Sequence, residues 1–179
     1  MILFGEGDNQ PSVIDTGFYY LEQLLASIDL SLTDINRQID ASGETDREYL
    51  CDHGEYLIGV GFCAMQRYLF DFLQDEDIDP GLARELGPHS TKGVPIAKLI
   101  HAAGNYWKHE PEWHVWLTEL KKRSQDTVDA VLHGKDSSHY PLAALLYELS
   151  GNEPLLLSNC LPHLTEWRDH VVDKLTKSA

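Results

Sequence analysis

The stretch from Lys98 to Trp113, KLIHAAGNYWKHEPEW, holds polar side chains whose types and spacing could perform chemistry. Successive residues of a helix are turned by about 100°, so a helix beginning near Pro95 would gather several polar side chains in one sector. These side chains are Lys98, His101, Asn105, Lys108 and His109. An imidazole that titrates near neutral pH can transfer protons, and neighbouring ammonium and amide groups can stabilise negative charge. The opposite side of this helix is aliphatic and aromatic, and we expect it to be buried.

Other groups of potential metal ligands fit a site less well. The zinc-protease pattern needs two histidines four residues apart on one helix, whereas His109 and His114 are five apart across Pro111. The acidic run that begins at Asp75 lacks the glycine and the glutamate of an EF-hand loop. Another trio has the spacing of any exposed helix face: His163, Glu166 and His170. A zinc site remains an alternative that would use His101, His109 and His114, but we predict no metal.

Length and charge limit the class of protein. The chain of 179 residues is long enough for one domain, spanning 1–179, with its own hydrophobic core. Its 29 acidic and 14 basic side chains give a net charge of -15, which repels polyanions at long range. Extended DNA binding is therefore disfavoured, while a small basic site for RNA is still allowed.

Cysteine usage and hydropathy predict a compartment. The three cysteines have no metal-type spacing, and Cys51 and Cys63 are about three helical turns apart, too far for a disulfide. The first ten residues lack the basic region of a secretory signal. The most apolar stretch, Tyr56 to Leu73, is interrupted by polar residues, which predicts a buried helix and no membrane span. We expect a cytoplasmic protein with reduced thiols.

The hydrophobic pattern predicts two long helices at the start of the chain. Apolar residues recur at helical spacing from Val13 to about Ala41. A second helix should run to about Gln74, opened by Thr45 and Glu48 at the spacing of a capping box. It is apolar on nearly every side, and its glycines would allow a neighbour to approach closely. We expect it to form the buried centre of the fold.

Shorter helices follow the long pair. Residues 75–93 form the longest connection, with a short turn near 82–86. After the polar stretch, one helix should run from Pro111 to Gly134, a shorter one from Pro141 to Gly151, and a last one from Pro162. No stretch alternates as a strand would. The sequence thus predicts an all-α bundle of five to seven helices, built on a long antiparallel helix pair.

The segment from Gly104 to His109, GNYWKH, resembles the motif of the HEPN superfamily. That motif is an arginine, then four to six residues, then a histidine, often with a polar residue directly after the arginine. Asn105 matches the polar position and His109 the histidine, whereas Gly104 stands where the family has its arginine. The resemblance covers this core and the preceding pair of long helices. It implies an all-α domain of prokaryotic ribonucleases and toxins that acts in toxin–antitoxin or antiviral defence, pairs as a homodimer and needs no cofactor.

The chemistry that this resemblance implies is metal-independent RNA cleavage. His109 would be the acid/base and Asn105 a positioning donor. Because Gly104 replaces the arginine, the positive charge would come from Lys108, Lys98 or another helix, where Arg67 stands inside the most apolar helix. A guanidinium buried there would need a partner. His101 and Lys98 are candidates for contacting the substrate.

Two alternatives remain open. In the first, the residues are structural or catalytically degenerate: Asn105 and His109 would bond to each other or cap the helix, and Arg67 would pair with Asp71 one turn away. In the second, the chain is a non-catalytic acidic binding protein, such as an antitoxin, immunity protein or inhibitor. Its charge would then steer it onto a basic protein partner.

Overall fold

The computed structural model describes residues 2–4, 11–13, 15–41, 43–113, 120–132, 139–151 and 155–177. Apart from a short hairpin near the start of the chain, these residues form an all-α bundle, as predicted. Its α-helices are α1 Thr16–Ala41, α2 Glu44–Leu73, α3 Pro80–Ala83, α4 Ile96–His109, α5 Lys122–Leu132, α6 Pro141–Ser150 and α7 Leu161–Thr176. Two short 3-10 helices accompany them, η1 Glu110–Glu112 and η2 Leu157–Cys160.

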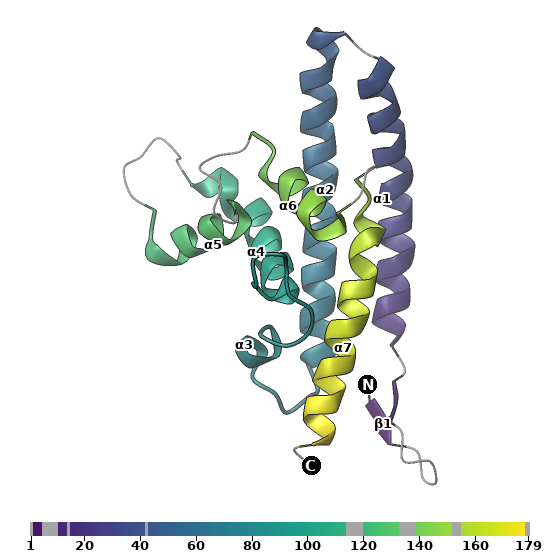
Figure 1. Cartoon of the computed structure of the whole chain (residues 1–179), viewed down its shortest axis with the longest axis vertical. Helices are drawn as coiled ribbons and strands as arrows, with labels where there is room; N and C mark the ends of the chain where they lie inside the picture. Colours follow the sequence, from purple (N-terminus) through teal and green to yellow (C-terminus); the bar gives the residue numbers. More distant parts are fainter. Residues whose placement is uncertain are drawn as a thin grey trace.

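The predicted long antiparallel pair is present. Figure 1 shows α1 and α2 side by side, with their connected ends rising above the other helices and α7 running along the lower part of the pair. The buried face of α1 follows a helical repeat through Leu21, Leu25, Ile28, Leu32 and Ile35. The carboxylate of Asp15 accepts the backbone N–H of Phe18 at 2.9 Å and so caps the start of α1.

α2 lies at the centre of the bundle, and its glycines allow close neighbours, as expected. A Cβ atom on Gly59 would lie 1.8 Å from Cδ1 of Trp107, and one on Gly61 would lie 2.3 Å from Cδ1 of Leu157. Neither position has room for a larger residue. The predicted capping box was wrong, because α2 begins at Glu44 with Gly43 as its N-cap and no side-chain cap.

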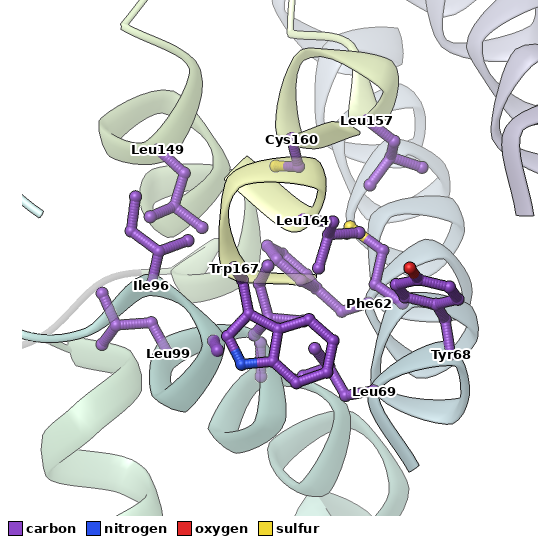
Figure 2. Packing of buried hydrophobic residues seen from close by; sticks show 14 of the residues in the cluster. Phe62, Tyr68, Leu69, Ile96, Leu99, Leu149, Leu157, Cys160, Leu164 and Trp167 are labelled. Carbon is purple, nitrogen blue, oxygen red and sulfur yellow. The ribbon is translucent and has the colours of Figure 1, made fainter. Parts of the chain in front are cut away.

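The hydrophobic core joins α7 to α2 and α4. Figure 2 shows Trp167 of α7 close to Leu69 of α2, with Leu99 of α4 nearby. The indole of Trp167 is 1 % exposed, and its Nε1–H donates to the carbonyl of Ala83 at 2.9 Å. This bond satisfies the one polar group that the tryptophan brings into the core.

Two carboxylates of the long pair cap helices that come later in the chain. Asp29, which is 7 % exposed, accepts the N–H of Leu157 at 2.7 Å and of Ser158 at 3.0 Å. Glu55 accepts the N–H of Leu142 at 2.7 Å and of Ala143 at 2.8 Å. The first N–H groups of a helix have no partner within it, so these bonds fasten η2 to α1 and α6 to α2.

Two predictions on secondary structure were wrong. Ile2–Phe4 (β1) and Pro11–Val13 (β2) pair as an antiparallel hairpin, whose three-residue strands are too short for alternation to be recognised. The helix expected from Pro111 does not form there. η1 ends at Glu112, Trp113 has an extended backbone, and α5 begins only at Lys122. Residues 114–119 and 133–134 of that prediction lie outside the described residues.

The sequence predicted that no helix spans a membrane, and the lengths and hydropathies of the helices bear on this prediction. Among the residues described, none of the helices combines the length and the apolar character that crossing a bilayer requires.

Candidate functional site

The polar face of α4 meets a glutamine of α2 that is almost fully buried. Gln66 is 3 % exposed, and its Nε2 lies 2.8 Å from the carbonyl oxygen of His101 and 2.9 Å from Oδ1 of Asn105. Its Oε1 accepts a hydrogen bond of 2.6 Å from Nζ of Lys108. Three residues of the predicted face therefore form one polar network with Gln66, which cross-links α4 to α2.

His101 sits between two side-chain amides. Its Nδ1 is 3.1 Å from Nε2 of Gln66, and its Nε2 is 3.1 Å from Nδ2 of Asn105. A protonated ring would set N–H donors against amide nitrogens that also carry hydrogens, so the neutral ring fits better. Burial, followed by the charges of Arg84, Lys108 and Arg123, lowers the pKa of His101 to about 4. His101 is thus a structural member of the network and a poor acid/base near neutral pH.

Gly104 is a contact point between α2 and α4. A Cβ atom on this residue would lie 2.8 Å from Oε1 and 3.0 Å from Cβ of Gln66. The carbonyl of Gly104 accepts a bond of 3.4 Å from Sγ of Cys63. An arginine does not fit at this position, so the cation of the HEPN motif cannot be supplied from here.

His109 lies in a pocket between the end of α4, η1 and the start of α5, which we call the α4/α5 pocket. It has a volume of about 250 Å³. Its lining residues are Asn105, His109, Glu112, Trp113, Arg123, Ser124 and Thr127. The His109 side chain is 50 % exposed, and its Nδ1 lies 3.4 Å from Oε1 of Glu112. This contact favours a proton on Nδ1, which leaves Nε2 as the basic nitrogen.

The pocket brings an arginine to the histidine. Arg123, in the first turn of α5, is exposed and lines the pocket with His109 and Asn105. Neither Arg123 nor Gln66 was predicted from the sequence as a site residue. The signals available were the basic run 121–123 and the single amide inside the apolar part of α2. Neither of these sequence features shows that Gln66 and Arg123 face α4.

The other predicted residues are placed elsewhere. Lys98 pairs with Glu85 at 2.6 Å, and its position eleven residues before His109 is about 16 Å along the helix axis. The expectation that Arg67 is buried was wrong. Its side chain is 76 % exposed, pairs with Asp71 at 2.7 Å, and lines a groove between α1 and α2. Hydropathy indicates that α2 is mostly buried, but it does not show that Arg67 lies on the side of this helix that faces solvent.

The potential metal ligands are dispersed or bonded to the backbone. Within the described ranges, no three histidine, cysteine or acidic side chains gather as a metal site would require. His163 lies 2.9 Å from the carbonyl oxygen of Leu149, and His170 lies 2.8 Å from that of Glu166. His114, the third ligand of the zinc alternative, is outside the described residues. Cys51, Cys63 and Cys160 are free thiols, as the spacing predicted.

Comparisons with protein-family models, curated proteins and solved structures found no match to this chain. The fold and the site together define an all-α bundle in which a buried polar network adjoins an open pocket with a histidine and an arginine.

Proposed function

We propose that the α4/α5 pocket binds an RNA phosphate and that His109 supports metal-independent cleavage there. The protein would then be a HEPN-like ribonuclease, or a catalytically degenerate relative, in a toxin–antitoxin or antiviral defence setting. The observation that supports this proposal is the pocket itself, in which His109 lies with an exposed arginine and a firmly held amide. Arg123 takes the role that the missing motif arginine would have.

The proposed reaction is an attack of the ribose 2′-oxygen on the adjacent phosphorus. Nε2 of His109 takes the 2′-hydroxyl proton, while Glu112 holds the opposite nitrogen. The bond from phosphorus to the 2′-oxygen forms as the bond to the 5′-oxygen breaks, and the leaving oxygen takes a proton from solvent. Arg123 and the remaining N–H of Asn105 would stabilise the charge on the phosphate. The products are a 2′,3′-cyclic phosphate and a 5′-hydroxyl.

The local charge is compatible with an anionic substrate, although the whole chain is acidic. Arg84, Lys108 and Arg123 all act on His101, where their positive charges lower the pKa of the imidazole. Three cations therefore lie near His101, within a protein of net charge -15. A short RNA segment would be bound here, while longer contacts would be repelled.

The test compares the wild type with His109→Ala and Arg123→Gln. We expect cleavage of single-stranded RNA by the wild type in the presence of a chelator, loss of cleavage in His109→Ala, and weaker RNA binding in Arg123→Gln. Lys98→Gln is the matched control, because Lys98 lies on the same helix but pairs with Glu85. Equal RNA cleavage and equal toxicity on expression for wild type and His109→Ala would refute the nuclease proposal.

A second candidate is a non-catalytic acidic binding protein, and the net charge of -15 favours it. Such a protein would bind a basic partner in a salt-sensitive manner, and His109→Ala would leave that binding unchanged. Both candidates are compatible with a cytoplasmic setting, which the free thiols support. We also propose a homodimer, on the basis of the HEPN resemblance. Sedimentation of the full chain tests it.

A further inference from the structure

A larger pocket lies beside η1, between α2, the end of α4 and the start of α6. We call it the aromatic pocket. Its volume is about 610 Å³. Three aromatic side chains line it, Tyr56, Tyr106 and Trp107, and three carboxylates do so as well, Asp52, Glu55 and Glu110. It is distinct from the α4/α5 pocket, since Glu110 lines one and Glu112 lines the other.

The aromatic wall of this pocket is held in place. The indole of Trp107 lies directly over Gly59, where an added Cβ atom would be 1.8 Å from Cδ1 of the ring. The ring of Tyr56 meets that indole edge-on, with 5.4 Å between the ring centroids. Trp107 is thus packed on two sides, and a ligand would meet aromatic groups that need little reordering.

The charges in the aromatic pocket are mainly negative. Its three carboxylates stand against one ammonium, that of Lys108, whose Nζ is bonded to Gln66 at 2.6 Å. Glu55 already accepts two N–H bonds from α6, and Asp52 accepts a hydrogen bond from the hydroxyl of Tyr140, so the exposed Glu110 is the carboxylate most open to a ligand. Burial raises the pKa of Tyr106, and the charges of Glu110 and Glu55 raise it further. The pocket therefore disfavours anions.

We propose that the aromatic pocket binds an organic cation, an alkylammonium or guanidinium group. Trp107 and Tyr56 would offer their rings to the cation, and Asp52 and Glu110 would neutralise its charge. The group could belong to a free small molecule or to a lysine or arginine side chain of a protein partner, since the recognition chemistry is the same. This binding site is independent of RNA cleavage and uses none of the lining residues of the α4/α5 pocket.

The test is calorimetric titration of the full chain with three probes. Spermidine represents a free cation, a capped Gly-Arg-Gly peptide represents a protein side chain, and a capped Gly-Gln-Gly peptide is the neutral control. Tyr56→Ala and Glu110→Gln should each weaken cation binding about two- to fivefold. Two matched control variants should change the affinity for the cation less than about twofold. They are Tyr49→Ala, on the same helix and 73 % exposed, and Glu112→Gln, in the same 3-10 helix.

The results of these titrations distinguish a free cation from a protein side chain. They also distinguish cation binding from the proposed RNA cleavage. Saturable binding of spermidine alone supports a free cation, and binding of the arginine peptide alone supports a protein side chain. The inference is overturned if neither probe binds saturably, if the glutamine peptide binds equally well, or if Tyr56→Ala behaves like Tyr49→Ala. His109→Ala should leave cation binding unchanged, so a failure of the nuclease proposal would be seen separately.

Discussion

Gly104→Ala should destabilise the protein, although replacing a glycine inside a helix usually has the opposite effect. The added methyl group would lie 2.8 Å from Oε1 and 3.0 Å from Cβ of Gln66. Rotation of the Gln66 side chain can remove the first contact but not the second, because the Cβ atom is fixed to the α2 backbone. The two helices must move apart, or the amide must leave the network.

The magnitude follows from three contributions. Alanine gains about 1 kcal/mol over glycine in helix propensity. Overpacking costs about 1–3 kcal/mol. Moving the Gln66 amide breaks its bonds to His101, Asn105 and Lys108, and each polar group left buried without a partner costs about 1–3 kcal/mol. We expect a net loss of about 2–4 kcal/mol in the free energy of unfolding, equivalent to roughly 5–15 °C in Tm for a chain of this size.

Urea unfolding followed by circular dichroism measures the effect. Gly54→Ala is the matched control in α2, because its Cβ atom would lie 3.8 Å from Cγ2 of Ile35, an ordinary contact. This control should gain about 0.5–1 kcal/mol. In a Gln66→Ala background, Gly104→Ala should cost less, since the amide bonds are already absent. Gly104→Ala as stable as the wild type would refute the network as the link between α2 and α4.

Further predictions concern pH and two buried polar groups. Because His101 has a folded pKa of about 4 against an ordinary 6.5, the unfolded chain binds its proton first as the pH falls, so the protein loses stability from about pH 6.5 to pH 4. The shift corresponds to about 3 kcal/mol, which solvent screening of this half-buried ring reduces to about 1–2 kcal/mol. Between pH 6.5 and pH 4, the free energy of unfolding of His101→Gln, measured in urea, should therefore depend less on pH than that of the wild type. The same pH dependence in both proteins would contradict this prediction. Asp29→Asn should cost about 1–3 kcal/mol because the N–H of Leu157 or Ser158 loses its carboxylate, and a neutral effect in urea unfolding would contradict that capping role. Tyr68→Phe should cost about 1–2 kcal/mol in the same assay, since it removes the 2.6 Å bond to Asp15, and an unchanged midpoint would show that this bond is not stabilising.

The architecture could be predicted from the sequence where the hydrophobic repeat is long. The stripe of α1 and the apolar α2 with its glycines contain enough turns to specify both helices and their pairing. The failures are short elements. The strands of β1 and β2 have three residues each, and Pro111 suits a 3-10 turn as well as the first turn of an α-helix.

The candidate site could be predicted only in part. Helical periodicity placed His101, Asn105 and His109 on one side of α4, but that side spans a boundary between buried and exposed surface. His101 and Asn105 turn toward Gln66, whereas His109 opens into the α4/α5 pocket. Gln66 and Arg123 come from other helices, and their positions depend on helix packing. No local pattern in the sequence contains that information.

The measurement that tests the proposed function most directly is an end-group analysis of RNA incubated with the protein and a chelator. The proposal predicts 2′,3′-cyclic phosphate ends with the wild type, none with His109→Ala, and none at a position where the substrate carries a 2′-deoxyribose. Cleavage of the deoxy position, or the same products from His109→Ala, would contradict the role of His109 and with it the proposed reaction.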